Sequence, residues 1–197
     1  MIVKISEIAD AQSGLVLSRK EAKEVSAKTY KFKRLTLRSL GDTGFISKEN
    51  LEDFYSNESL PNALFTSTDD IAIRLCSPMC PITVENDNQG LLVPSQIALL
   101  RVKKNAPILP EYLRLCLAQK ETQERVLKIE EGTAQRTVKL GTIMDLQISI
   151  PDIETQRKAV QLDILSRERE QMYRELIAQE RLYTDKIIAD IIGGTLK

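Results

Sequence analysis

A run of basic side chains near the amino terminus is the first feature that could do chemistry. Residues 16–40 contain eight Lys or Arg side chains against Glu21 and Glu24, which gives a net charge of +6. Ammonium and guanidinium groups neutralise phosphates, and the same groups donate hydrogen bonds to base edges. Two interpretations stay open on the residues alone: a solvated strand face, and a surface that contacts phosphates.

An acidic segment follows this basic one. Residues 49–73 carry six Asp or Glu side chains and no Lys or Arg, which gives a net charge of −6. The two segments predict a strongly dipolar domain. The whole sequence has a formal net charge of zero, which argues against nonspecific attraction to polyanions.

The residues available for catalysis are few. The sequence has no His, which removes the commonest general base and the usual catalytic zinc ligands. Cys76 and Cys80 are spaced C-x3-C, but only Cys116 could join them, so a zinc site would need a carboxylate and reduced, mostly buried thiols are expected. No glycine-rich phosphate loop occurs, and no [DE]-x-K follows Pro151 and Asp152 at a usable distance, as a metal-dependent nuclease would need. We therefore expect no catalytic site, no metal and no cofactor in this chain.

The elements that would position the basic residues are mostly strands. The stretch "YKFKRLTLRSL", from residue 30 to 40, nearly alternates apolar and basic residues, so one face of a strand would pack while Lys31, Lys33 and Arg38 lie on the other. Short strands are also expected around residues 64–75, 81–84, 90–93 and 96–102. One helix is predicted from Pro110 to a C-terminal glycine at Gly132. The clearest strand alternates over Met144, Leu146, Ile148 and Ile150.

A long helix closes the sequence. Pro151 ends the strand, Asp152 is a suitable N-cap, and residues 153–192 contain neither Pro nor Gly. A 40-residue helix is roughly 60 Å long, well beyond the width of a small domain. It carries an apolar stripe with two charged interruptions, which consists of Leu162, Leu165, Arg169, Tyr173, Leu176, Glu180, Tyr183, Ile187 and Ile191.

The stripe suggests a partner helix. If two copies pair antiparallel about a point between residues 174 and 175, Arg169 faces Glu180 of the second copy, and Tyr173 faces Leu176. The two interruptions then complement each other. The fold class predicted from all these elements is α+β: a mixed, β-rich domain over residues 1–150, followed by one long C-terminal helix over residues 151–197.

One string resembles a known family. "GTAQRTVKLGTIMDLQISIPDIETQ" is similar to the conserved segment of the specificity (S) subunits of type I restriction–modification enzymes, in which an apolar strand ends in a proline before a helix start. The matching positions are Gly132, Ala134, Gln135, Leu140, Leu146, Ile148, Ile150, Pro151, Ile153, Glu154 and Gln156. Asp152 departs from the family, which often has Pro there. "KISEIADAQSG" and "GLLVPSQIALLRVKKNAPILPEYLRLCL" resemble the family's domain opening and its later strand and helix.

The resemblance implies a function. In that family a target recognition domain reads one half of a split DNA sequence, and conserved helices act as a spacer and recruit modification (M) subunits, which bind S-adenosylmethionine and methylate adenine. Restriction (R) subunits complete the complex. With double-stranded DNA as the implied partner, the candidate contacts are Arg19, Lys20, Lys31, Lys33, Arg34, Arg38, Lys103, Lys104, Arg136 and Lys139.

The length departs from the family pattern. A standard S subunit has two recognition domains and two helices, whereas 197 residues provide one of each. A half-subunit that forms a homodimer, a truncated or silent copy, and a fragment all remain open. The alternatives in function are a scaffold that dimerises through its helix without binding DNA, and an enzyme with an unrecognised carboxylate site. The charged N-terminus and the lack of long apolar runs lead us to expect a cytoplasmic protein that spans no membrane.

Overall fold

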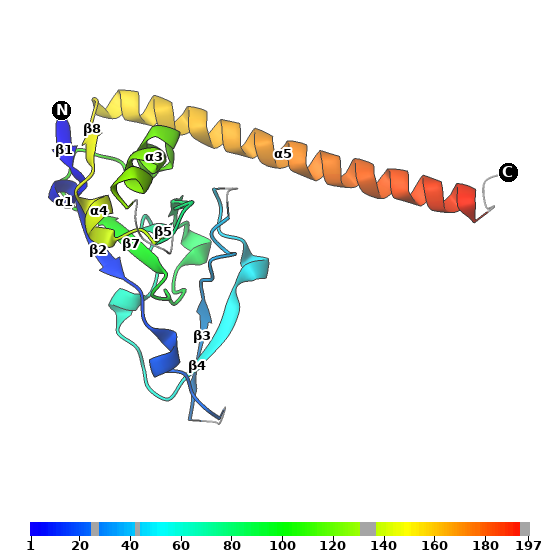
Figure 1. The fold of residues 1–197 in the computed structure, drawn as a ribbon, viewed down its shortest axis with the longest axis horizontal. Helices are drawn as coiled ribbons and strands as arrows, with labels where there is room; N and C mark the ends of the chain where they lie inside the picture. The colour runs from blue at the N-terminus through cyan, green and yellow to red at the C-terminus, as the bar shows by residue number, and fades with distance from the viewer. Residues whose placement is uncertain (25–27, 42–43, 131–136, 194–197) are drawn as a thin grey trace. The chain divides into compact units, whose positions relative to one another are not determined.

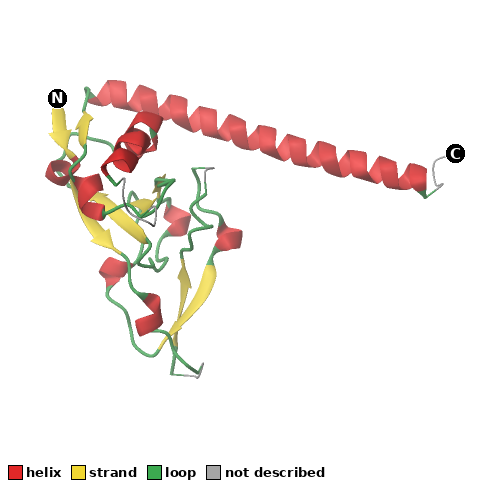
Figure 2. Ribbon diagram, viewed as in Figure 1, coloured by secondary structure: helices red, strands yellow, loops and turns green. Residues whose placement is uncertain are grey.

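The computed structural model describes residues 1–24, 28–41, 44–130 and 137–193. Figures 1 and 2 show a β-rich part with short helices and one long helix, and this confirms the α+β prediction. The chain divides into two compact units, residues 1–160 and 161–197. Within the described ranges, no helix has the length and apolar character needed to cross a membrane.

The described strands form one larger sheet and two smaller ones, all with antiparallel pairing. The central sheet has the order β2-β7-β5-β6, and its strands are β2 (Ala9–Ser13), β7 (Ile97–Val102), β5 (Ile71–Arg74) and β6 (Ile82–Thr83). Two-stranded sheets join β1 (Ile2–Lys4) to β8 (Gln147–Ser149), and β3 (Tyr30–Arg34) to β4 (Glu52–Ser56).

The described helices are short except for the last. The α-helices are α1 (Ile5–Ile8), α2 (Pro110–Ala118), α3 (Lys120–Ile129), α4 (Leu140–Met144) and α5 (Ile153–Ile192). Four 3-10 turns also occur in the described ranges, η1 (Leu17–Arg19), η2 (Lys48–Asn50), η3 (Asn62–Leu64) and η4 (Asn86–Asn88).

The central sheet is buried on both faces. In β7, Ala98 and Leu100 belong to one core cluster, while Ile97 and Leu99 belong to the other. The first cluster also contains apolar residues of α2, α3, α4 and β8, and the second contains Leu35 from the segment after β3. Burial on both sides explains why "QIALLRV" is apolar without alternating, since neither face meets water.

The predicted helix from Pro110 to Gly132 is wrong in its continuity. The backbone of Gln119 is extended, with φ −59° and ψ 135°, and it separates α2 from α3. Leu117 and Val126 are nine residues apart, which places them on opposite sides of a straight helix, yet both are fully buried in the same cluster. The break turns both side chains into that core. Gly132 lies outside the described residues.

Several predicted strands also differ from the structure. The strand expected over residues 30–40 ends at Arg34, and residues 90–93 belong to no named strand. Met144 ends α4, and the strand β8 itself spans only Gln147–Ser149. The alternating burial is nevertheless confirmed for Leu146, Ile148 and Ile150, each at most 5% exposed. Residues 62–64 form η3 rather than part of a strand. The α5 prediction is confirmed: the helix spans Ile153–Ile192, and Asp152 caps it by accepting hydrogen bonds from the Thr155 N–H (2.9 Å) and hydroxyl (2.7 Å).

The start of α5 is fixed to the preceding chain by a buried amide. Gln156 is fully buried, and its Oε1 accepts a hydrogen bond from the Leu109 N–H at 2.9 Å. Its Nε2 donates to the carbonyls of Pro107 at 2.9 Å and Pro151 at 3.0 Å. One side chain thereby joins the first turn of α5 to the segment that enters α2.

Candidate nucleic-acid interface

The candidate site is built on the β3–β4 ribbon. The register pairs Phe32 with Phe54 and Lys33 with Asp53, so side chains alternate between two faces. Phe54 is 3% exposed, and Phe32 lies 5.2 Å from the Phe65 ring, measured between ring centroids. This face is packed around Phe32 and Phe54, although Tyr30 at its end is 48% exposed, and the other face carries the exposed Lys31 and Lys33.

Three charged side chains occupy the exposed face. The Lys31 ammonium lies 2.8 Å from Asp53 Oδ2, and the Lys33 ammonium lies 2.8 Å from Asp53 Oδ1. Lys31 also lies over the ring of Tyr55, at 5.7 Å from its centroid. We call Lys31, Asp53 and Lys33 the ribbon triad. It carries two positive charges and one negative charge.

The triad is exposed but ordered by its own contacts. Both lysine side chains are 57% exposed and the Asp53 side chain is 33% exposed. The hydrogen bond from Lys31, and to a smaller extent the one from Lys33, lowers the pKa of Asp53. The hydrogen bond to Asp53 in turn raises the pKa of Lys31. These two groups therefore stay charged at neutral pH. Exposed ion pairs of this kind contribute little to stability, so a ligand could replace them at low cost.

The expected strong dipole is not supported, because the acidic segment folds onto the basic one and pairs with it. Besides the triad, Arg34 pairs with Glu52, and Lys20 pairs with Glu58. Arg34 is also partly buried, since its Nε has no accessible surface. Arg19 and Arg38 are exposed and have no ion-pair partner among the described residues. The structure thus brings Lys31, Lys33 and Arg34 together on one ribbon, where each faces an acid.

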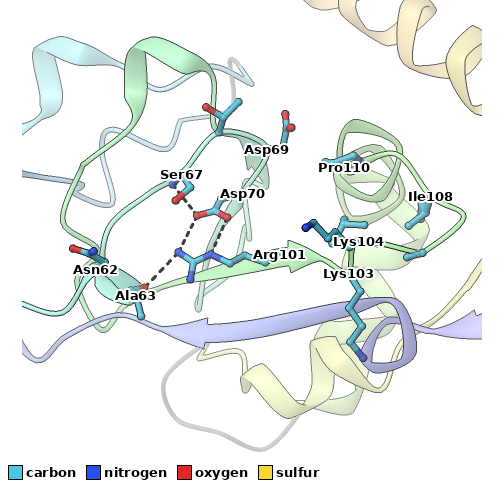
Figure 3. Close-up of a pocket in the computed structure, with 13 residues that line it drawn as sticks. Asn62, Ala63, Ser67, Asp69, Asp70, Arg101, Lys103, Lys104, Ile108 and Pro110 are labelled. Atoms are coloured by element: carbon cyan, nitrogen blue, oxygen red, sulfur yellow. Dashed lines mark hydrogen bonds and ion pairs between the residues drawn. The ribbon is translucent and has the colours of Figure 1, made fainter.

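The two predicted lysines that follow β7, Lys103 and Lys104, lie at a different surface. Arg101, Lys103 and Lys104 help to line a cavity of about 600 Å³, shown in Figure 3. Lys103 extends to α1, where its ammonium donates to the carbonyls of Ser6 (2.8 Å) and Glu7 (3.3 Å). Lys104 is exposed and has no ion-pair partner in the part of the chain that the structure describes.

Arg101 and Asp70 form a clamp beside this cavity. The guanidinium contacts both carboxylate oxygens, at 2.9 and 3.1 Å, and also donates to the Phe65 carbonyl at 3.0 Å. The Ser67 N–H donates to the same carboxylate at 2.9 Å, and Asp70 is 3% exposed. The pair fixes the loop before β5 onto β7. The preceding residue, Asp69, also lies in that loop, with φ 66°.

The last two candidates have different outcomes. The Lys139 ammonium lies 3.5 Å from Oε2 of the buried Glu130. The pKa of Glu130 is lowered, mainly because its carboxylate accepts a hydrogen bond from the Thr142 hydroxyl. Lys139 thus belongs to a local network around α4. Arg136, like Gly132, Ala134 and Gln135 of the family-like string, lies outside the described residues.

Sequence reasoning missed Asp53 and Tyr55 as members of the site. The alternating pattern predicted the exposed face of β3, but no local signal gives the register of β4 against it. The three cysteines form no disulfide and are half-buried. Among the described residues, no cluster of three or more His, Cys, Asp or Glu side chains could hold a metal ion.

Comparison with known proteins identifies the family. The type I restriction modification DNA specificity domain matches residues 1–175. A search of curated proteins found no match.

Two solved structures are similar in fold. One is the HsdS subunit from Thermoanaerobacter tengcongensis, with 16% identity and a TM-score of 0.64 over 95% of this chain and 47% of that chain. The other is the type I restriction-modification S subunit from M. genitalium, with 16% identity and a TM-score of 0.56 over 94% of this chain and 44% of that chain. This chain therefore spans under half the length of each. By the match over residues 1–175, it belongs to the type I restriction modification DNA specificity domain family.

Proposed function

We propose that the chain is a half-length specificity subunit that reads one half of a double-stranded DNA site. Residues 1–150 would form the recognition domain, and residues 151–197 would form the spacer and dimerisation helix. Family membership and the match to under half of two S subunits support this proposal. The chain would select the sequence, while M and R subunits would supply the S-adenosylmethionine chemistry and the cleavage.

The β3–β4 ribbon is the observation that carries the proposal. The major groove of DNA is about 12 Å wide and admits a two-stranded ribbon. This ribbon has one face anchored by Phe32 and Phe54 and one exposed face that presents Lys31 and Lys33. An anchored ribbon with exposed donors can enter the groove without rearranging the core behind it.

The test replaces the two ribbon lysines. We expect the double variant Lys31→Ala, Lys33→Ala to bind DNA at least tenfold more weakly, because two positive charges leave the interface. The log–log dependence of affinity on salt should become shallower, because the variant brings two fewer positive charges to the polyanion. Fluorescence anisotropy with duplex DNA at several salt concentrations, with and without an M subunit, measures both quantities.

A matched control uses lysines elsewhere on the surface. Lys120 on α3 and Lys158 on α5 are exposed and paired with Glu124 and Glu154, so the double variant Lys120→Ala, Lys158→Ala makes the same charge change outside the ribbon. It should keep most of the affinity. Equal losses in the two double variants would show a general charge effect and would count against the ribbon as the interface.

We also propose that α5 pairs with a second copy. Its apolar side chains are exposed, including Leu162 (71%), Met172 (65%) and Tyr183 (67%). In the antiparallel register centred between residues 174 and 175, Leu162 would meet Ile187, and Met172 would meet Ile177. Arg169 and Glu180 have no ion-pair partner among the described residues, unlike Arg174, which pairs with Glu170. They are therefore available to each other across a dimer.

A charge exchange tests this register. Arg169→Glu should weaken self-association several-fold. In the dimer each new glutamate at position 169 would face Glu180 of the other copy, so two repulsive pairs would form. Adding Glu180→Arg should restore most of the loss. Sedimentation equilibrium measures the dimer constant, with Lys120→Glu on α3 as the control for the charge change. A double variant no better than the single one would rule out this register.

A scaffold that dimerises without binding DNA is the second candidate, and the exposed apolar side chains of α5 favour it. The two candidates differ in the anisotropy experiment. A scaffold would show no DNA affinity for the ribbon variants to lose, while its dimer constant would still respond to Arg169→Glu.

A further inference from the structure

We infer that the ribbon triad reads an A·T base pair from the major groove, with Asp53 accepting a hydrogen bond from the adenine amino group. This inference rests on the proposed DNA-binding function. It goes further because it assigns a base identity to three named side chains.

The triad has a defined order of donors and acceptors. Asp53 lies in the middle, with Oδ2 toward Lys31 and Oδ1 toward Lys33, each at 2.8 Å from the ammonium nitrogen. An ammonium has three donor hydrogens, and a carboxylate has about four acceptor positions. Each group can therefore keep its neighbour and still bind one further partner. Across the exposed face the triad presents donor, acceptor, donor.

Only A·T has the complementary order of acceptor, donor, acceptor across its major-groove edge. In the major groove, A·T presents adenine N7 as acceptor, the adenine amino group as donor and thymine O4 as acceptor. G·C presents two acceptors, N7 and O6 of guanine, before the amino donor of cytosine. A central carboxylate therefore meets a donor in A·T, but it meets guanine O6, another acceptor, in G·C. The order of the triad selects A·T.

The position of Asp53 between the two lysines also favours contact with base edges over contact with the sugar–phosphate backbone of DNA. A phosphate would bind the two lysines and repel Asp53 between them. The floor of the major groove, in contrast, offers amino hydrogens that a carboxylate can accept. An acid between two cations therefore weakens binding to the DNA phosphates. It also increases the selectivity among base pairs.

The surroundings hold the triad in place. Asp53 lies directly opposite Lys33 in the register and diagonally opposite Lys31, so one carboxylate spans both lysines. Tyr55 lies opposite Lys31 and contacts its ammonium through the ring. Beside an A·T pair, that ring could contact the thymine methyl.

A selection experiment tests the inference with the full-length chain. Wild-type protein and Asp53→Ala are each used to select binders from a randomised duplex library, and the preferred bases are compared position by position. We expect one A·T position to lose its preference in Asp53→Ala by roughly tenfold, the usual effect of one mismatched pair. Every other position should be unchanged. Asp87→Ala removes an exposed carboxylate that is likewise paired with a lysine, so it controls for overall charge.

Base analogues identify the groove. Replacing the selected A·T pair by 2,6-diaminopurine·T changes only the minor groove, and affinity should be kept. Replacing it by inosine·C changes the major groove to the pattern of G·C, and affinity should fall roughly tenfold for wild type but not for Asp53→Ala. A selected sequence that Asp53→Ala leaves unchanged, or that relaxes at a G·C position, would overturn the inference while leaving DNA binding intact. Failure of wild type to select any sequence would instead defeat the proposed function, and the inference with it.

Discussion

Replacing Gln156 by alanine is expected to lower the free energy of unfolding by about 3 kcal/mol, because it removes three hydrogen bonds that each contribute about 1 kcal/mol. The Leu109 N–H and the carbonyls of Pro107 and Pro151 all bond to this one side chain, which is fully buried. For a chain of this size the melting temperature should fall by roughly 6–12 °C. Thermal unfolding followed by circular dichroism measures the change.

Two further variants isolate the cause. Gln161→Ala removes the same amide from an exposed position of the same helix, and its effect should stay within about 0.5 kcal/mol. Gln156→Glu keeps the shape and the acceptor for Leu109, but it loses the two donors and buries a charge. It should be destabilising at neutral pH, and its deficit against wild type should shrink as the pH falls toward about 4.3 and the new carboxyl binds a proton. A Gln156→Ala protein as stable as Gln161→Ala would show that the three bonds do not hold the segment.

Gly14→Ala should be as damaging as the loss of Gln156, for a steric reason. A Cβ at this position would lie 2.1 Å from the Pro94 carbonyl oxygen and 2.5 Å from that of Val93. Both neighbours are backbone atoms, and the Leu15 N–H donates to the Val93 carbonyl at 2.8 Å, so the clash cannot be relieved by turning a side chain. We expect a loss of about 3 kcal/mol or more. Urea unfolding at equilibrium measures it.

The control is the same substitution at an open glycine. Gly141 lies in α4, and nothing lies within 4 Å of the Cβ that alanine would add there. Because alanine is the better helix former, Gly141→Ala should raise stability by about 0.5–1 kcal/mol. If both glycine variants changed stability in the same direction and by similar amounts, the close approach at Gly14 would not be the cause.

Local signals in the sequence were enough to predict the beginning of α5 but not the break between α2 and α3. Pro151 cannot continue a ladder, and Asp152 caps the next turn, so both act within a few residues. Gln119, in contrast, has no helix-breaking chemistry. Its extended backbone follows from the need to bury Leu117 and Val126 in one core, which depends on residues far away in the chain.

In the candidate site, too, local sequence predicted some features, while others depended on residues far away in the chain. The alternation was enough to predict that Lys31 and Lys33 would be exposed and that Phe32 would pack, but Tyr30, which was also expected to pack, is 48% exposed. It could not give the partner of the two lysines, because the 17 residues between β3 and β4 leave the register free. Gln156 was recognised as part of a family-like string, but its role as a buried link could be seen only once Pro107 and Leu109 were placed beside it.

The pairing of cations on β3 with acids on β4 has a consequence for how such a domain can diversify. A mutation in one strand leaves a charge on the other strand without its partner, so a single change alters the net charge that this surface presents to a ligand. Exchanges made on both strands together keep the balance and present a new order of donors and acceptors. On this surface, the unit of evolutionary change would be the cross-strand pair rather than the single residue.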